Sequence, residues 1–222
     1  MIKRTIILGE YNTAAHGWTL AAWRLSPAEE KTSFVDIPGG DGSWDMSTAL
    51  TDGIPRYYDR ELTVTLECSE GDRLHREALI RHMVNLLDGM RVDIELPDDP
   101  YHYITGRLHV AREYNDPAHA AVTVTGTCRP WKYNRTETRV QLEARTSKQS
   151  ARLVNSGRLA VVPVVTVTGT GAEVLLEFGS TSRALAAGSY KLPDLLLTPG
   201  AHDITYSGTG VAAITYREAV LE

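Results

Sequence analysis

Alternation of apolar and polar residues dominates the first 130 residues of this 222-residue chain. It is clearest from Leu62 to Leu66, where every second residue is aliphatic and the residues between them are threonines. A period of two places successive side chains on opposite faces of a β-strand, so each alternating run predicts a half-buried strand. Two short apolar runs near the N-terminus predict two more. Strands are therefore predicted at residues 2–8, 20–25, 62–67, 91–96, 103–111 and 121–128.

One segment between these strands has a different period. From Asp72 onward the apolar residues recur every three or four positions, as they do on one face of an α-helix. Asp72 or Ser69 can cap the start of such a helix, and Gly89 supplies the left-handed residue that commonly follows a helix. A helix is therefore predicted at about 70–88. Residues 1–133 are predicted to form an α+β domain in which this helix lies on a sandwich-like or barrel-like sheet.

The second half of the chain has short strand patterns and no helical period. Strand-like runs follow one another every eight to twelve residues and are separated by glycine or proline. This spacing is typical of an antiparallel β-sandwich, which is the fold predicted for residues 153–222. Residues 134–152 are predicted to be a polar connecting segment with room for one strand, and the sequences at 169–171 and 208–210 are interpreted as hairpin turns. The whole chain is thus predicted to be mainly β.

The net charge of −5 is unevenly distributed. Residues 1–130 contain 13 Lys/Arg and 20 Asp/Glu, which gives −7; residues 131–158 contain 7 and 2, which gives +5; the remainder contains 3 and 6, which gives −3. Binding to nucleic-acid phosphates needs clustered cations, so the acidic first half argues against a DNA-binding protein. No apolar run is long enough to span a membrane. The two cysteines, Cys68 and Cys128, are predicted to be buried thiols in strands, and a disulfide between them stays open as the alternative, because strands distant in sequence can be neighbours.

The segment from Phe34 to Asp52 combines a strand pattern with an unusual turn. The strand pattern Phe34–Ile37 runs into Pro38-Gly39-Gly40-Asp41-Gly42. One proline and three glycines in this order predict a tight turn of special backbone conformation. Trp44 follows the turn and is interpreted as an apolar plug against it. On its residues alone, the segment is predicted to be a structured β-turn.

Several motifs of this sequence resemble those of one protein family. VDIPGGDGSWD at 35–45 precedes the strand pattern RELTVTL at 60–66. The second half contains N-x-G at 155–157, L-x-P-G-x-H-x-I at 197–204 and Y-R-E at 216–218. In type and in order, these motifs resemble those of the distal tail (Dit) proteins of long-tailed, non-contractile bacteriophages and prophages.

The resemblance implies a structural protein of the phage tail tip or baseplate, assembled in the cytoplasm of the host bacterium and carried in the virion. The N-terminal domains of the family form a hexameric ring, and galectin-like C-terminal sandwiches project outward from it. The ring joins the tail tube protein to the tail-associated hub or fibre protein, and baseplate or receptor-binding proteins are further candidate partners. DNA passes through the ring without specific binding. No cofactor, metal or membrane is expected.

Two sets of residues are predicted to matter for such a ring. The first set would lie at a subunit contact: Asp36, Ile37, Pro38, Asp41, Trp44 and Asp45. The second set consists of acids in turns, which would face the channel and repel the phosphates of the passing DNA. These acids are Asp98, Asp99 and Asp116, with Asp41 and Asp45 as further candidates.

Two other classes of function stay open from the sequence. A carbohydrate-binding adhesion module would need exposed aromatic residues, of which the end of the chain has few: Phe178, Tyr190, Tyr206 and Tyr216. A cell-wall glycosidase or peptidase would need converging acids or a nucleophile. The candidate acids are Asp36, Asp41, Asp45 and Asp98. Because no nucleophile motif, phosphate-binding loop or histidine pair at metal-ligand spacing is present, an enzyme is not expected.

Overall fold

The computed structural model describes residues 5–51 and 53–222. The chain divides into two compact units, unit 1 at residues 1–132 with Glu222 and unit 2 at residues 133–221. Strands predominate in both units, and the described residues contain one α-helix, which lies in unit 1. The prediction of a mainly β chain with a helix in its first half is therefore confirmed.

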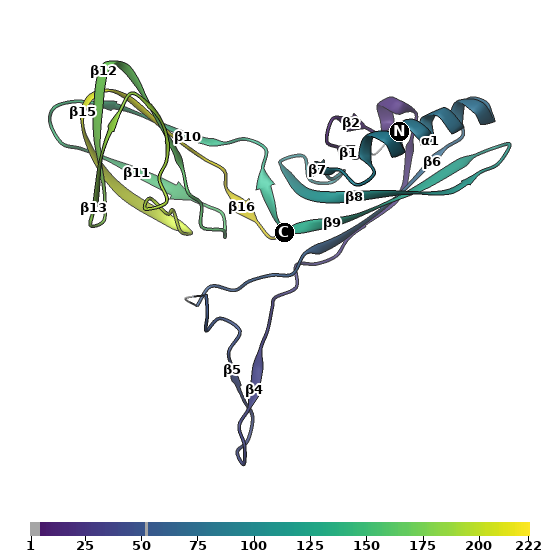
Figure 1. Ribbon diagram of the computed structural model, residues 1–222, viewed down its shortest axis with the longest axis horizontal. Coiled ribbons are helices and arrows are strands. Elements are labelled where there is room, and N and C mark those ends of the chain that lie inside the picture. Colours follow the sequence, from purple (N-terminus) through teal and green to yellow (C-terminus); the bar gives the residue numbers. More distant parts are fainter. Residues whose placement is uncertain (1–4, 52) are drawn as a thin grey trace. The chain divides into compact units, whose positions relative to one another are not determined.

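Unit 1 is built on a curved antiparallel sheet (Figure 1). The predicted alternation is visible in it, since Leu62, Val64 and Leu66 are buried while the threonines between them point to the other face. Of the predicted strand at 2–8, residues 2–4 lie outside the described part of the chain. Across the sheet the strand order is β2 (Tyr11–Asn12), β1 (Ile7–Leu8), β7 (Arg91–Glu95), β8 (His102–Asn115), β9 (Ala120–Asn134), β6 (Arg60–Cys68) and β3 (Thr19–Leu25).

The helix α1 (Arg73–Leu87) lies across one face of this sheet (Figure 1). Asp72 precedes it, and its carboxylate accepts a hydrogen bond from the backbone N–H of His75 at 2.7 Å, which caps the helix. Ile80 and Met83 are buried and belong to the same hydrophobic cluster as the inward-facing strand residues. A short 3-10 helix, η1 (Ala14–His16), follows β2. The helix predicted at about 70–88 is thus present, one turn shorter.

Arg76 is buried on α1, with 1% of its surface exposed. Its guanidinium donates to the backbone carbonyl of Gly71 at 2.6 Å and to those of Asp116 and Pro117 at 3.0 Å each. Asp116 and Pro117 belong to the turn between β8 and β9. This one side chain therefore fastens the start of the helix to the end of a strand pair distant in sequence.

Cys128 and Cys68 are buried free thiols, as predicted. The sulfur of Cys128 occupies space left by Gly106, where a Cβ would lie 2.5 Å from it. Burial raises the pKa of the Cys128 thiol to about 11. The neutral thiol is thus part of the folded core.

We expect the free energy of unfolding to fall between about pH 9 and pH 11. An unfolded cysteine ionises near 9.0, whereas the folded Cys128 stays neutral until about 11, so in this interval only the unfolded state gains by losing the proton. The contribution is fully present below about pH 9 and is lost as the pH rises through the folded pKa. Urea denaturation at pH 8 and at about pH 10.5 measures the loss. Cys128→Ala should lose less stability than the wild type over this interval, and an equal loss in both would contradict this role of Cys128.

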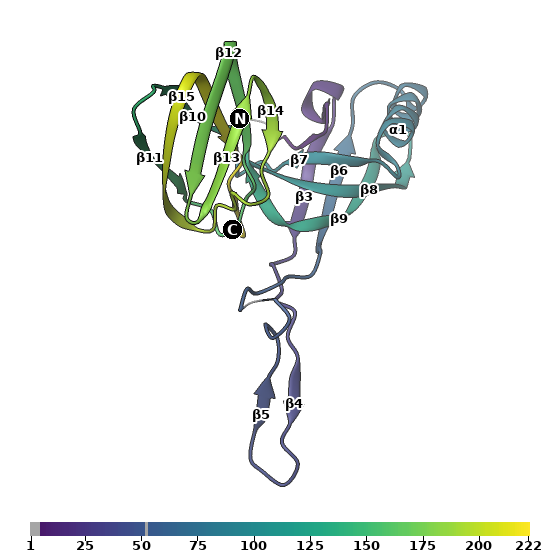
Figure 2. The same ribbon diagram turned by 60° about the vertical axis from the view of Figure 1, so that its left-hand side comes forward.

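Unit 2 is a curled antiparallel sheet built around two long strands, β12 (Val164–Phe178) and β15 (Gly200–Tyr216) (Figure 2). These strands pair with each other, and each pairs with a different further strand along each of its halves. The curled sheet encloses one hydrophobic cluster, as the predicted sandwich requires. The other strands of unit 2 are β10 (Thr138–Ala144), β11 (Gln149–Asn155), β13 (Thr181–Ala186), β14 (Gly188–Lys191) and β16 (Ala219–Val220).

The glycine pairs at 169–171 and 208–210 are not hairpin turns, contrary to the prediction. They lie inside β12 and β15, near the point where the pairing register of the two strands shifts. Gly208 has a φ of +131°, and a Cβ there would lie 2.1 Å from the carbonyl oxygen of Glu173. Glycine is required by both the backbone conformation and the close approach. These sequences therefore bend two continuous strands instead of ending them.

Residues 134–152 contribute two strands to the sheet of unit 2, whereas a connecting segment with room for one strand was predicted. They contain β10 and most of β11, and both strands pair with β15. Leu142 and Leu153 are buried, while the intervening side chains are largely polar and exposed. An edge strand with one solvated face needs few apolar residues, so its composition is close to that of a linker.

Asn155 explains the N-x-G motif of unit 2. Its buried side chain donates to the carbonyls of Leu159 and Leu197 at 2.8 and 2.9 Å, and its Oδ1 accepts from the N–H of Gly157 at 3.0 Å. Gly157 lies so close to the backbone of Ala219 that a Cβ would be 2.5 Å from the carbonyl oxygen of that residue. The motif therefore holds the end of β11 against the C-terminal segment.

The Y-R-E motif forms hydrogen bonds to the residues on either side of Asn155. The hydroxyl of Tyr216 donates to the carbonyl of Val154 at 2.7 Å. The carboxylate of Glu218 accepts from the backbone N–H of Ser156 at 3.1 Å. Motifs about 60 residues apart in the sequence are thus brought together by hydrogen bonds, and their role in unit 2 is structural.

Asn155→Ala should lower the free energy of unfolding of unit 2 by about 2–3 kcal/mol, because it leaves the buried carbonyls of Leu159 and Leu197 without their donor. Ser150→Ala, at an exposed position of the same strand, should change stability by less than about 0.5 kcal/mol. Urea denaturation of the two variants and the wild type measures the difference. Equal stability of the two variants would contradict the role assigned to Asn155.

Candidate functional site

Residues 27–59 leave the sheet of unit 1 between β3 and β6, and we call this segment the arm. It carries a two-stranded hairpin, β4 (Phe34–Asp36) and β5 (Ser43–Asp45), which projects away from the sheet (Figures 1 and 2). None of the described residues of the arm is buried. The arm is therefore held at its root and has no packing partner along its length within the described chain.

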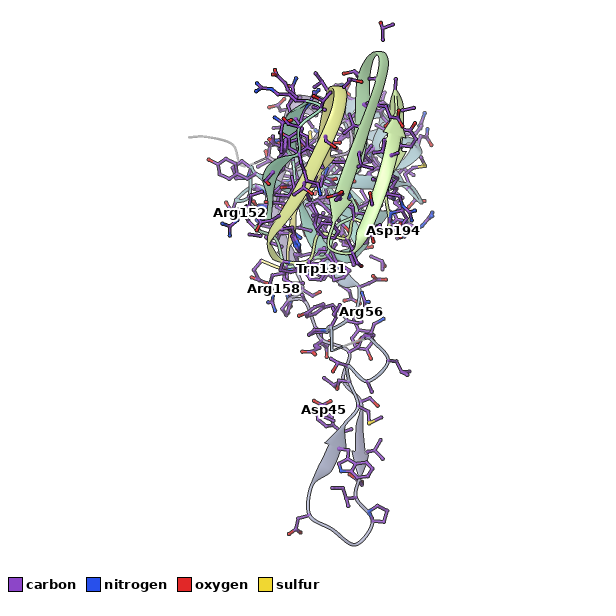
Figure 3. The ribbon with its side chains drawn as sticks, turned by 90° about the vertical axis from the view of Figure 1, so that its left-hand side faces the viewer. Asp45, Arg56, Trp131, Arg152, Arg158 and Asp194 are labelled. Atoms are coloured by element: carbon purple, nitrogen blue, oxygen red, sulfur yellow. The ribbon has the colours of Figure 1, made fainter. Side chains whose placement is uncertain are left out.

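The root of the arm is fixed to the sheet. Arg60, which has 3% of its surface exposed, donates from Nε to the carbonyl of Ser26 at 2.6 Å. Tyr57 meets the ring of Trp131 edge-on, with 5.5 Å between the ring centroids. Figure 3 shows Arg56 and Trp131 at this end of the arm and Asp45 farther out, on the hairpin. The root of the arm is thus held by a buried hydrogen bond and by an aromatic contact.

The hairpin has two chemically different faces. Residues directly opposite each other on paired strands point to the same side, and their sequence neighbours point to the other side. Val35 is paired with Trp44, and Phe34 with Asp45. One side, the apolar face, therefore consists of Val35, Ile37, Trp44 and Met46. The other side, the acidic face, consists of Phe34, Asp36 and Asp45.

The apolar face is open to solvent. Trp44 has 66% of its surface exposed and Val35 has 49%. Trp44 is therefore not a plug against the turn, contrary to the prediction, because no described part of the chain covers this side of the hairpin. An isolated two-stranded hairpin is marginally stable in water, and a contiguous exposed apolar patch marks an interaction surface. The apolar face thus has the composition and exposure of an interaction surface.

The structure brings the predicted contact residues together on this hairpin. Pro38 and Asp41 lie in its turn, which uses positive φ angles at Gly39 (+74°) and Gly42 (+79°). Hydrogen bonds from Ser47 lower the pKa of the Asp45 carboxyl. The predicted set on the hairpin is Asp36, Ile37, Pro38, Asp41, Trp44 and Asp45.

Sequence reasoning missed most of the apolar side chains that the arm exposes. Periodicity reports burial inside one chain, so residues that require another chain for burial produce no regular period. The available signal was a concentration of large apolar residues in a stretch that has neither helical nor sustained strand alternation. The missed residues are Phe34, Val35, Met46, Leu50, Ile54 and Tyr58.

The acids predicted to face a channel lie at opposite ends of β8. Asp98 and Asp99 are in the connection from β7 to β8. The carboxylate of Asp99 lies 2.7 Å from Nδ1 of His102 and 3.1 Å from Nζ of Lys132, so it has local partners. Asp116 is in the turn that follows β8, so the fourteen residues of this strand lie between it and the other two acids.

Asp116 organises the turn in which it lies. Its carboxylate accepts from the backbone N–H groups of Ala118 and His119 at 2.8 and 2.7 Å. These hydrogen bonds lower the pKa of the carboxyl. The turn is also the one that Arg76 holds through its carbonyls. Asp116 therefore has a structural role whatever its position in an assembly.

The residues considered for metal binding or catalysis do not form an enclosed site. His82 of α1 lies near His16 of η1, with 5.8 Å between the ring centroids. Among the described residues no group of three or more His, Cys, Asp or Glu side chains could hold a metal ion. The candidate acids Asp36, Asp41 and Asp45 lie on the open hairpin. No described helix is long and apolar enough to cross a membrane.

The aromatic residues considered for sugar binding belong to the core of unit 2. Tyr206 and Tyr216 are buried, with 8% and 4% of their surfaces exposed. Phe178 and Tyr190 are partly buried and pack against the same hydrophobic cluster. None of the four is available as an open platform for a sugar ring.

Comparisons with protein-family models and with curated proteins gave no match. A comparison with solved structures found the crystal structure of the Dit protein of phage SPP1, described as a paradigm of the hub adsorption apparatus in phages that infect Gram-positive bacteria. The TM-score is 0.67 at 18% sequence identity, and the similarity covers 97% of this chain and 98% of that chain. This chain has the Dit fold.

The Dit fold agrees with the fold that the motifs of the two halves implied. The hydrogen bonds of Asn155 and Tyr216 give those motifs a physical reason, since they close unit 2. The hairpin motif makes no comparable contacts with the described part of the chain, because its side chains are exposed. Its residues therefore point to a contact outside the chain.

Proposed function

We propose that this chain is a distal tail protein, a structural and non-catalytic component of a phage tail tip. Copies of unit 1 form a hexameric ring that joins the tail tube protein to the tail-associated hub or fibre protein, with baseplate or receptor-binding proteins as further partners. The ring is assembled in the host cytoplasm and carried in the virion. The Dit fold, shared over 97% of the chain, supports a role in the tail.

The exposed hairpin is the observation that best supports the proposed ring. Its predicted contact residues sit on a projection that no described part of the chain covers. At about 3.3 Å per residue, the extended stretch from Pro27 to Pro38 spans about 36 Å, which is enough to reach across a neighbouring copy. The hairpin and the surface that receives it are different parts of the chain. Such a heterologous contact produces a ring when its rotation closes.

In this proposal unit 1 surrounds the path of the DNA. The charge of −7 on residues 1–130 would repel the phosphates and keep the duplex from adhering during passage. Asp98, Asp99 and Asp116 remain the proposed channel-facing acids. Because they lie at opposite ends of β8, they would act at two levels of the channel and not in a single belt.

Electron microscopy of the purified protein tests the proposal. Class averages of the negatively stained protein, alone and mixed with its tail tube protein, should show rings with six-fold symmetry and a central opening. Averages that contain only single chains under both conditions, or a closed two-fold dimer, would contradict the ring.

A further inference from the structure

Three arginines gather on the exposed face of the unit 1 sheet. Arg91 in β7 lies directly opposite Arg107 in β8. Arg129 comes from β9, the next strand across the sheet. All three line one shallow depression together with Asp59, the last residue of the arm. We call these three residues the arginine cluster.

Positive charge exceeds negative charge in this depression, since its lining residues include the three arginines and one acid, Asp59. Arg107 donates to the backbone carbonyl of Gly89, which carries no net charge. Arg91 and Arg129 form no ion pair with any described residue. Like charges directly opposite each other on paired strands destabilise a sheet. A surface that retains such a pair is therefore suited to binding an anion.

The acidic face of the hairpin has the complementary chemistry. Between Phe34 and Thr51 the sequence contains three aspartates and no lysine or arginine. Carboxylates such as those of Asp36 and Asp45 pair with guanidinium groups through two parallel hydrogen bonds. Phe34, with 59% of its surface exposed, offers an aromatic ring on which a guanidinium can stack. Both kinds of group on this face thus match arginine.

We propose that the acidic face of the hairpin of one copy docks on the arginine cluster of the next copy. This docking rests on the proposed ring and names the surface that receives the arm. Because Asp59 borders the cluster, the incoming arm lies beside the root of the outgoing arm, and the contacts continue from copy to copy. A DNA duplex is the competing occupant, but the net charge of −7 on residues 1–130 opposes a long polyanion more than a short hairpin.

Charge reversal tests the docking by sedimentation velocity on the full chain. Arg91→Glu with Arg129→Glu should weaken self-association by about tenfold or more, and Asp36→Arg with Asp45→Arg should do the same. A chain that carries all four substitutions should recover association. The matched control is Arg139→Glu with Arg158→Glu on exposed positions of unit 2, which should associate like the wild type; Figure 3 shows Arg158.

The single variant Arg91→Glu serves as the control for an effect of charge reversal on folding. It replaces a pair of like charges by a pair of opposite charges opposite Arg107, so its melting temperature should equal or exceed that of the wild type. Weaker association without loss of stability therefore separates docking from folding.

The remaining outcomes overturn the docking in distinguishable ways. If the cluster reversal leaves association unchanged while removal of the hairpin abolishes it, the ring stands and the arginine cluster is not the landing surface. If the reversal leaves the ring intact and removes only salt-sensitive binding of a DNA duplex, the cluster is a phosphate site. A wild-type chain that associates neither at high concentration nor in the presence of its neighbouring tail proteins overturns the ring and the docking together.

Discussion

Deletion of residues 34–45, with Ser33 joined to Met46 through Asn-Gly, should leave this protein as single chains at concentrations where the wild type forms rings. Ser33 and Met46 face each other across the hairpin, since the N–H of Met46 donates to the carbonyl of Ser33 at 2.8 Å. A two-residue Asn-Gly turn therefore closes the shortened arm without strain. No buried residue is removed, so the melting temperature of the single chain should stay unchanged.

A single substitution tests whether the apolar face itself contributes to association, apart from the loss of surface area that the deletion causes. Trp44→Ser should weaken association by about 2 kcal/mol or more, because exposed aromatics at interfaces contribute strongly when they become buried. Tyr101→Ser is the matched control, since Tyr101 is an aromatic of unit 1 with 78% of its surface exposed and lies outside the arm. Analytical ultracentrifugation over a concentration series measures both. Equal effects of the two substitutions would argue against a specific role of the hairpin.

Arg76→Ala should destabilise unit 1 by about 3 kcal/mol. The substitution removes three hydrogen bonds to backbone carbonyls and leaves a cavity between α1 and the β8–β9 turn. Arg73→Ala, on an exposed position of the same helix, should change stability by less than about 0.5 kcal/mol. Urea denaturation followed by circular dichroism measures both variants.

Hydrogen exchange shows where Arg76→Ala loosens the structure of unit 1. If the helix and the turn separate in Arg76→Ala, hydrogen exchange should increase in residues 72–78 and 115–119 before it increases in β6. A variant as stable as Arg73→Ala would show that solvent replaces the donor at these carbonyls. The buried arginine would then have no measurable structural role.

The parts of the fold that sequence predicted well are those with one buried and one solvated face. Leu62, Val64 and Leu66 alternate with threonines because β6 has the core on one side only. The helix could be placed because its apolar period, its Asp72 cap and Gly89 agree. The Cys128 environment followed from its position in such a strand.

The predictions that were wrong concern strands whose boundaries depend on their partners. The local sequence at 169–171 and 208–210 predicts that strands end there. In the structure these glycines bend β12 and β15, because strand pairing continues on both sides of the bend. Residues 134–152 are too polar to be recognised as strands until β15 supplies their hydrogen bonds. A local sequence pattern does not show which distant segments a strand will pair with.

The candidate site was found only in part for a related reason. The turn at 38–42 has a clear local signal, and its neighbours Asp36 and Trp44 were placed correctly on the same element. The exposure of Trp44 could not be predicted, because an apolar residue gives the same signal whether its partner is in its own chain or in another. The arginine cluster is assembled from three strands and has no signal in the sequence.

The mass of the purified protein in solution tests the central claim most directly. One chain has a mass of 24.4 kDa, so a hexameric ring should appear at about 146 kDa by mass photometry or by light scattering after size exclusion. The account predicts this species at high concentration or in the presence of the neighbouring tail proteins. A protein that stays at the mass of a single chain under both conditions would contradict it.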